Sequence, residues 1–291
     1  MSDRYVIMTE SSCDLSQELV ERAGLDVLPL TFTMEGKTYA HYPDTREYPL
    51  DRFYEKLKGG AVAVTAAANM IELSSAMEAH LSAGEDILFL CFSSGLSSTR
   101  DACAIAAQEL ADKYPDRKIY TVDTVSACSG QGLLAYLTAQ KREAGATIEE
   151  ARDFAESIKL QICHWFLVND LMFLKRGGRV SSSAAVVGTM LNVKPILYVD
   201  NSGHLETAEK VRGRKPAMHR LLEKMEETAL DPQNGTVMIA GAACPEDVET
   251  LRAMVEERFH PKELFLNEIG PIIGAHVGPG MLALLFVGEH R

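Results

Sequence analysis

Hydroxyl side chains gather in one short stretch of the sequence, Ser93-Ser94-Gly95-Leu96-Ser97-Ser98-Thr99. An apolar run, Ile87 to Phe92, precedes this stretch, and a helical pattern of apolar residues follows it. The hydroxyl groups are therefore expected at a strand-to-helix turn, where the first helical N–H groups lack internal partners and the helix dipole is positive. Such a turn suits an anionic oxygen of a carboxylate or a phosphate.

The same stretch also has a purely structural explanation. Ser98 is expected to cap the helix, with Asp101 in place of the usual Glu or Gln of a capping box. One serine is enough for a cap, whereas this stretch holds four serines and a threonine around one glycine. The excess of hydroxyl groups favours a binding site.

A second candidate is His276, which lies in a segment rich in glycine and proline from Gly270 to Gly280. Such framing predicts that special backbone conformations place this histidine, rather than helix or strand packing. An imidazole can hold a carboxylate or an anchoring hydroxyl group.

Ser94 and His276 are also a possible nucleophile and base, so a serine-dependent acyl hydrolase is the alternative hypothesis. The sequence offers no evident orienting acid for that pair. It also lacks the G-x-S-x-G, Walker A, G-x-G-x-x-G and H-E-x-x-H motifs in a fitting context. The leading hypothesis is therefore a non-catalytic binding protein.

The composition limits the class of protein. With 291 residues, 46% of them hydrophobic, and a formal net charge of -12, the chain suits two globular domains and is a poor match for nucleic acid. Met1 to Glu10 resembles neither a secretory signal nor a membrane span, so we expect a cytoplasmic protein without an integral membrane segment. The six cysteines form no C-x-x-C pair and have no histidine at metal-ligand spacing, which predicts reduced thiols, no metal site and no cofactor.

Predicted strands and helices alternate through the first half of the chain and must position these side chains. The strands cover residues 5–9, 61–64, 87–92 and 117–122, and each precedes a polar turn and a helix. This alternation predicts a mostly parallel sheet flanked by helices. Ligands bind beyond the carboxyl ends of such strands, where these residues are expected to converge: Ser11, Thr65, Ser94 and Asp123.

Local signals add detail to the first half. Residues 25–32 and 37–40 flank Met34-Glu35-Gly36 and predict a hairpin. Three pairs fit the capping box that begins a helix: Asp14 with Gln17, Asn69 with Glu72, and Thr147 with Glu150.

The second half is predicted to be a separate α/β domain with a mixed sheet. Residues 165–168 are typical of a strand that leads out of the first domain, so we place the domains at residues 1–168 and 169–291. A helix that begins at 171 is interrupted by Gly177-Gly178, and a helix of small and apolar residues is expected from Ser181 to Leu191. Residues 195–199 and 205–211 predict a further hairpin.

Six segments, in order along nearly the whole chain, resemble the DegV family. The Gly-Gly-Arg and His-x-Gly-Pro-Gly segments are the specific ones. The segments are Ser11-Ser12-Cys13-Asp14-Leu15, the Thr65 loop, Phe92 to Thr99, Leu174-Lys175-Arg176-Gly177-Gly178-Arg179-Val180-Ser181, Asn192-Val193-Lys194-Pro195-Ile196-Leu197 and Gly274-Ala275-His276-Val277-Gly278-Pro279-Gly280.

This resemblance implies a non-catalytic protein of two α/β domains that holds one long-chain fatty acid, such as palmitate, stearate or oleate, in an interior tunnel between the domains. Bacterial members of the family present the carboxylate to a separate fatty acid kinase, which makes acyl phosphate for phospholipid synthesis. The implied partners are thus a fatty acid and a kinase.

The resemblance also implies the carboxylate contacts. They are Thr65, one serine of the turn Ser93-Ser94-Gly95, the histidine His276 and, with a looser match, Arg179. The chain departs from the family pattern at two places, and both bear on ligand choice. The usual Thr-Ser-x-Pro is Thr65-Ala66-Ala67-Ala68 here, and the usual Leu-Ser-Gly-Thr is Leu96-Ser97-Ser98-Thr99.

A basic segment, Lys210-Val211-Arg212-Gly213-Arg214-Lys215, opposes the net charge of the chain. A solvated loop is the simplest explanation. The segment precedes a helix predicted to begin at Pro216, however, where cations are mildly unfavourable. A similar basic run is implicated in kinase docking in the DegV family, so the resemblance predicts that Arg212, Arg214 and Lys215 contact an acidic patch of the partner.

Overall fold

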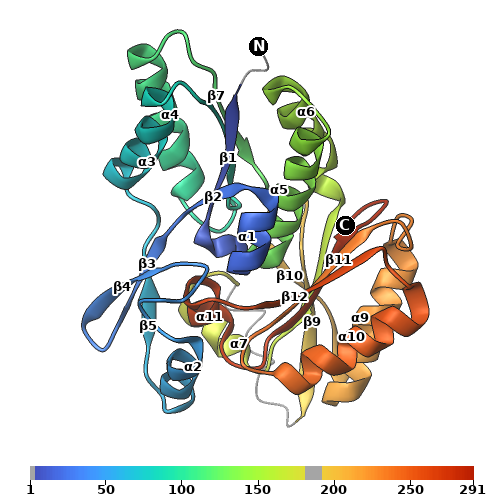
Figure 1. The fold of residues 1–291 in the computed structure, drawn as a ribbon. Coiled ribbons are helices and arrows are strands. Elements are labelled where there is room, and N and C mark those ends of the chain that lie inside the picture. The colour runs from blue at the N-terminus through green and yellow to red at the C-terminus, as the bar shows by residue number, and fades with distance from the viewer. Residues whose placement is uncertain (1–3, 181–191) are drawn as a thin grey trace.

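The computed structural model describes residues 4–180 and 192–291, so the predicted helix from Ser181 to Leu191 lies outside the described residues (Figure 1). Three sheets contain the strands, in the orders β2-β1-β6-β7, β4-β3-β5 and β10-β9-β8-β13-β11-β12. The strands are β1 (Tyr5–Glu10), β2 (Leu25–Leu28), β3 (Leu30–Met34), β4 (Lys37–His41), β5 (Ala63–Thr65), β6 (Asp86–Cys91), β7 (Ile119–Asp123), β8 (Ile162–Leu167), β9 (Val193–Val199), β10 (Leu205–Arg212), β11 (Thr236–Gly241), β12 (Glu263–Glu268) and β13 (Leu282–Val287).

Helices connect most of these strands. They are the α-helices α1 (Gln17–Ala23), α2 (Leu50–Lys58), α3 (Met70–Ser82), α4 (Thr99–Lys113), α5 (Cys128–Glu143), α6 (Ile148–Ile158), α7 (Leu171–Arg176), α9 (Arg214–Thr228), α10 (Pro245–Phe259) and α11 (Pro271–Val277), with 3-10 turns η1 (Ser11–Cys13) and η2 (Lys159–Gln161). None of the helices in the described part of the chain combines the length and apolar character needed to cross a bilayer.

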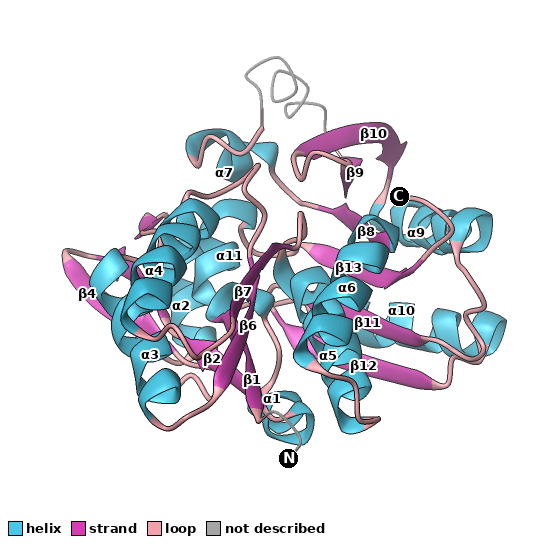
Figure 2. Cartoon of the chain, turned by 90° about the horizontal axis from the view of Figure 1, so that it is seen from above, coloured by secondary structure: helices cyan, strands magenta, loops and turns pink. Residues whose placement is uncertain are grey.

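The four-stranded sheet is entirely parallel and confirms the predicted fold class. Helices α3 and α4 cover one face, and α5 and α6 cover the other (Figure 2). Strand β6 is buried along its whole length, as expected for a strand with helices on both sides. Its carboxyl end therefore delivers the hydroxyl-rich turn to the start of α4.

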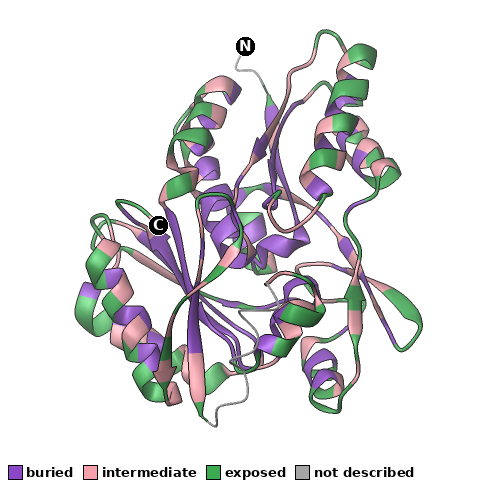
Figure 3. Cartoon of the chain, turned by 180° about the vertical axis from the view of Figure 1, so that it is seen from behind, coloured by how far each residue is buried: buried purple, intermediate pink, exposed green. Residues whose placement is uncertain are grey.

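The six-stranded sheet is mixed, because only β11 and β12 pair in parallel. Alternate residues of β8 pack in different cores: Trp165 and Leu167 lie beneath α9 and α10, whereas Phe166 faces the first half of the chain. Helix α5 packs against both large sheets and lies between them (Figure 2). Figure 3 shows the central strands as buried and much of α9 and α10 as exposed.

The predicted strand over residues 25–32 is in fact two strands in different sheets. Pro29 has no N–H to donate to a ladder, and it separates β2 from β3. Strand β3 instead forms the predicted hairpin with β4, and β5 adds to its other edge. Thr65 therefore belongs to a small antiparallel sheet. The expectation that it follows a strand of the parallel sheet was wrong.

Of the three predicted capping boxes, one is complete and a second is half formed. Thr147 and Glu150 form a complete capping box, and the Asn69 side chain accepts from the backbone N–H of Glu72. Asp14 does not cap α1, because Ser16 does so. Asp14 instead is buried with φ of 47°, and its Oδ1 accepts from the backbone N–H of Gly270 at 2.9 Å.

The domain boundary near Val168 stays a prediction. Strand β8 lies just before that residue and already pairs with β13 and β9 of the six-stranded sheet. The chain thus enters the second sheet before it reaches Val168.

Candidate functional site

A cavity of about 300 Å³ lies where the first half of the chain meets the six-stranded sheet, a volume within the range of small-molecule sites. Part of its lining is polar, and the residues of this part are called the polar end below. The polar end comprises Thr65, Ser97, Ser98, Thr99, Arg179 and His276. The rest of the lining is mainly apolar: Leu30, Ala66, Ala67, Phe92, Leu96, Ala127, Phe166, Leu174, Val199, Leu205, Ile272, Ile273, Val277, Met281, Ala283 and Leu285, with Ser12, Cys128 and His164.

Two adjacent chain segments form one wall of this cavity. Successive side chains of a strand point to opposite faces, so residues two apart share a face. Ala283 and Leu285 of β13 lie opposite Phe166 and His164 of β8, and all four line the cavity. This row runs from Met281 through Ala283 and Leu285 to His164, and the part of the lining around His164 is called the far end below.

Thr65 and His276 meet at the polar end. Thr65 Oγ1 and His276 Nε2 are 2.8 Å apart, although 211 residues separate them in sequence. Gly177, at the end of α7, allows this arrangement, since a Cβ there would lie 2.2 Å from His276 Nδ1. The prediction that special backbone conformations rather than a helix place His276 was wrong, because the residue lies in the short helix α11.

The His276 ring is neutral at physiological pH. Burial, and secondarily the positive charge of Arg179, lower the pKa of His276 to about 4. Its Nδ1 atom is buried and has no hydrogen-bond partner among the described residues. In the Nε2–H tautomer the imidazole donates to Thr65 Oγ1, which leaves the threonine proton available to an acceptor in the cavity.

Arg179 supplies the positive charge of the cavity lining. Its Nε donates to the carbonyl oxygen of Leu96 at 3.2 Å, and its Nη1 donates to the carbonyl oxygen of Gly177. Burial lowers the pKa of Arg179, but an arginine begins from so high a value that it stays charged. The guanidinium is thus held between the hydroxyl turn and the end of α7.

The start of α4 brings hydroxyl groups to the polar end, as predicted for this turn. Ser97 Oγ accepts from the N–H of Thr99 at 3.2 Å and lies 3.0 Å from Thr99 Oγ1. Thr99 Oγ1 also accepts from the N–H of Ala68, which ties the turn to the Thr65 loop. Ser98 makes no side-chain capping bond, so the structural explanation of that serine was wrong.

Ser93, Ser94 and Gly95 lie outside the cavity lining. Ser93 is fully buried and donates to the carbonyl oxygen of Gly203 at 2.8 Å, while Ser94 is exposed. A Cβ at Gly95 would lie 2.8 Å from the carbonyl oxygen of Gly203, so this glycine serves close packing. The ligand contacts predicted for Ser93, Ser94 and Gly95 stay predictions, and the absence of these residues from the cavity lining does not support them. Ser97 lines the cavity instead, and its signal in the sequence was its position next to the helix start.

Ser94 and His276 also lie in different surroundings. Ser94 is exposed, and its N–H donates to Asp123 Oδ1 at 3.2 Å, whereas His276 faces Thr65 in the cavity. The geometry therefore does not supply the nucleophile and base of the alternative hydrolase hypothesis. In residues 4–180 and 192–291, no group of three or more His, Cys, Asp and Glu side chains is placed to hold a metal ion.

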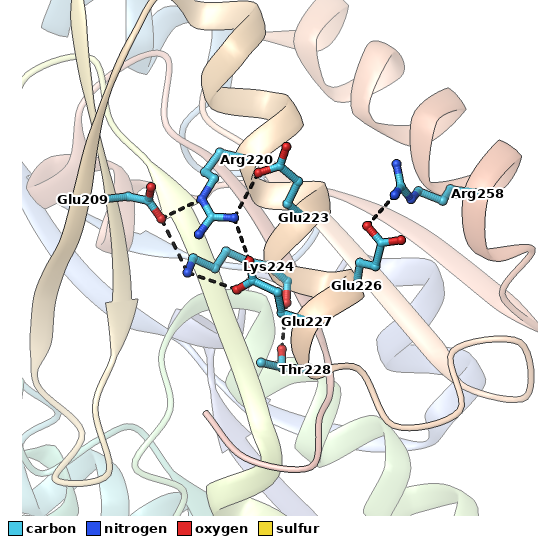
Figure 4. Close-up of polar contacts among 8 residues, drawn as sticks. All are labelled: Glu209, Arg220, Glu223, Lys224, Glu226, Glu227, Thr228 and Arg258. Carbon is cyan, nitrogen blue, oxygen red and sulfur yellow. Dashed lines mark hydrogen bonds and ion pairs between the residues drawn. The ribbon is translucent and has the colours of Figure 1, made fainter.

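The basic segment divides into two kinds of residue. Arg212, on the edge strand β10, and Lys215 are exposed. Arg214 begins α9, two residues before the predicted start, and its Nε lies 2.9 Å from Asp247 Oδ2. Its Nη1 also donates to the carbonyl oxygen of Gly280. Figure 4 shows that Glu209 of β10 is likewise tied inward, to Arg220 and Lys224 of α9.

Comparisons with known proteins cover the whole chain. A family model described as "Uncharacterised protein, DegV family" matches residues 4–289. A DegV domain-containing protein of Clostridium perfringens is 39% identical over 288 residues, which cover 99% of each chain.

Solved structures agree with the fold. One is a DegV family protein from Thermus thermophilus described as fatty acid binding, with a TM-score of 0.88, 28% identity and coverage of 98% of this chain and 99% of that chain. Another is DegV of Bacillus subtilis, described as a fatty acid binding protein, with a TM-score of 0.83, 27% identity and coverage of 99% and 100%.

Proposed function

Because this chain belongs to the DegV family, we propose that it is a cytoplasmic, non-catalytic carrier that binds one long-chain fatty acid in its cavity. The carboxylate lies at the polar end, and the acyl chain runs toward the far end. The observation that carries the proposal is a single cavity whose lining joins a few hydroxyl groups, Arg179 and His276 to a larger number of apolar side chains. Fatty acid binding by the Thermus thermophilus and Bacillus subtilis proteins supports it.

The polar end suits a carboxylate that is held rather than transformed. Thr65 and Ser97 offer hydroxyl donors, Arg179 offers positive charge, and α4 directs its positive dipole end to the same place. His276 lies beside the Thr65 hydroxyl, but its buried Nδ1 has no hydrogen-bond partner among the described residues, so the pair lacks the orienting acid of a catalytic triad. These features support binding without catalysis.

The apolar remainder supplies most of the affinity. Each buried methylene group contributes about 0.8 kcal/mol, so a long acyl chain binds tightly even after the cost of ordering it. Palmitate, stearate and oleate are the proposed ligands. Phenylalanine and leucine side chains form the wall, and Met281 adds a flexible apolar group.

Native mass spectrometry of the purified protein tests this function. We expect one fatty acid per chain, carried over from the expression host or bound after delipidation. A protein that binds no fatty acid but hydrolyses acyl esters would refute the carrier and restore the hydrolase alternative.

The serine contact can be tested with a matched pair of variants. Ser97→Ala should weaken stearate binding about tenfold, because a hydrogen bond to a charged group is worth about 1.5 to 3 kcal/mol. Ser94→Ala should leave binding unchanged, since Ser94 is exposed outside the cavity. Isothermal titration calorimetry measures both. If Ser94→Ala weakens stearate binding and Ser97→Ala does not, Ser94 rather than Ser97 contacts the carboxylate.

We also propose that the carrier presents the bound carboxylate to a fatty acid kinase for acyl phosphate formation and phospholipid synthesis. Docking then uses Arg212 and Lys215, which are exposed, while the ion pair with Asp247 gives Arg214 a structural role. Exposed charges at an interface mainly set the rate of association and its salt dependence.

Arg212→Glu should slow acyl phosphate formation in an assay reconstituted with the kinase and should flatten its salt dependence. Fatty acid occupancy and thermal stability should stay near wild type. Lys262→Glu is the matched control, because Lys262 is exposed beside β12, at the opposite edge of the same sheet. Equal effects of the two variants, or lipid loss in Arg212→Glu, would contradict docking at this edge.

A further inference from the structure

The guanidinium group of Arg291 is held behind the far end of the cavity by four acceptors from three segments of the chain. Its Nε donates to the carbonyl oxygen of Ile162 at 3.1 Å, and its Nη1 to that of Asp200 at 2.8 Å. Its Nη2 donates to the carbonyl oxygen of Lys159 at 2.7 Å and to Ser126 Oγ at 3.1 Å. Among the described residues it makes no ion pair with a carboxylate, so its role is to join backbone segments.

Three of these acceptors adjoin residues that line the far end. Ser126 precedes Ala127, and Asp200 follows Val199; both neighbours line the cavity. The carbonyl oxygen of Ile162 also bonds to Nδ1 of His164 at 2.8 Å. One guanidinium therefore contacts the three chain segments beside this wall, two of them through backbone carbonyl groups and one through the Ser126 side chain.

The His164 ring is fixed and neutral at this end. Its Nδ1–H donates to Ile162, so its Nε2 accepts from the backbone N–H of Ala127 at 3.3 Å. Burial, followed by the charge of Arg291, lowers the pKa of His164 to about 3. Both ring nitrogens are thus engaged, so His164 offers no free hydrogen-bonding nitrogen to the cavity.

A second contact holds the same region independently. The turn between β9 and β10 carries Gly203, whose carbonyl oxygen accepts from Ser93 Oγ. The Ser93 N–H in turn donates to the carbonyl oxygen of Ser126 at 3.0 Å. The turn is therefore attached to the first half of the chain by Ser93 and to the end of α6 by Arg291. Val199 and Leu205, on either side of the turn, line the cavity between these attachments.

We propose that Arg291 is a positioning residue that holds the far wall closed and thereby limits the length of acyl chain that the cavity accepts. The inference rests on the proposed fatty acid binding. Without the guanidinium, the freed carbonyl groups bind water, and the β9–β10 turn moves away from Ala127 and His164. The added room benefits long chains alone, since shorter chains end before this wall.

Competition between palmitate and the longer arachidate tests the proposal. Delipidated protein is mixed with equal excesses of both acids, and native mass spectrometry gives the ratio of the two complexes. Arg291→Ala should raise the arachidate-to-palmitate ratio about fivefold over wild type, which corresponds to about 1 kcal/mol of selectivity. Arg291→Lys should raise it less, because one ammonium group satisfies only part of the acceptor set. A general loss of structure would lower binding of both acids equally.

Two further variants complete the experiment. Arg258→Ala is the matched control, because this arginine of α10 pairs at the surface with Glu226 of α9 and should leave the ratio unchanged (Figure 4). Ser93→Ala should raise the arachidate-to-palmitate ratio, as Arg291→Ala does. It serves as the test of the proposal if Arg291→Ala fails to fold.

An unchanged arachidate-to-palmitate ratio in folded Arg291→Ala overturns the inference and leaves the proposed function intact. If Arg291→Ala does not fold, an unchanged ratio in Ser93→Ala has the same consequence. Wild-type protein that binds neither acid overturns the proposed function as well.

Discussion

Thr65→Val combined with His276→Ala should lower the affinity for stearate by about 10- to 150-fold. The Thr65 hydroxyl donates one hydrogen bond to the charged carboxylate, worth about 1.5 to 3 kcal/mol, and His276 orients that hydroxyl. The two side chains lie 2.8 Å apart, so their effects are coupled and the double variant should lose less than the sum of the single variants. Isothermal titration calorimetry of the two single variants and the double variant measures this coupling.

Two controls separate a loss of carboxylate binding from a damaged fold. Thr65→Ser keeps the hydroxyl group and should stay near wild type. Stearyl alcohol has the same chain without the charge, so its affinity should fall much less than that of stearate. Equal losses for acid and alcohol would show that the variants damage the cavity rather than the carboxylate contact.

The second large effect is expected from filling the middle of the cavity with Ala283→Phe. Ala283 lies on the lining row of β13, opposite Phe166 of β8. Its new ring would project into the cavity and occupy the path of the acyl chain. Native mass spectrometry should show almost no bound palmitate, while the melting temperature stays near or above that of the delipidated wild type.

The neighbouring strand provides a matched control for this variant. Ala240 of β11 pairs with Ala283 and is fully buried, but it does not line the cavity. Ala240→Phe should therefore overpack a filled core and destabilise the protein by about 1 to 3 kcal/mol. Palmitate retained in folded Ala283→Phe would show that the acyl chain follows another path.

Local patterns in the sequence predicted most of the elements that position the site, with α11 the exception. A continuous apolar run predicted β6, and the polar residues after it predicted the turn at the start of α4. The caps at Asn69 and Thr147 and the hairpin of β3 with β4 depend on residues close in sequence. Alternation of strands and helices likewise predicted the parallel sheet, because short connections and right-handed crossovers leave few other arrangements.

The direction of individual side chains at the turn needed the tertiary structure. Ser94 and Ser97 are three residues apart and have the same chemistry, yet Ser94 is exposed and Ser97 lines the cavity. A turn has no fixed period such as those of helices and strands, so spacing alone does not show which hydroxyl group faces inward. In the same way, only folding shows that Arg214 is held by Asp247, which lies 33 residues farther along the chain.

The remaining features of the site depend on contacts between segments that are distant in the sequence. Thr65 and His276 meet because β5 joins the small sheet and α11 packs beside it, and no local pattern encodes that meeting. Arg291 gathers acceptors 91 to 165 residues away. The sequence by itself therefore determined most of the elements and the kinds of side chain near the site, whereas α11 and the division of residues 25–32 into two strands were not predicted. The tertiary structure decided which of them share the cavity, because that depends on how the two large sheets pack around α5.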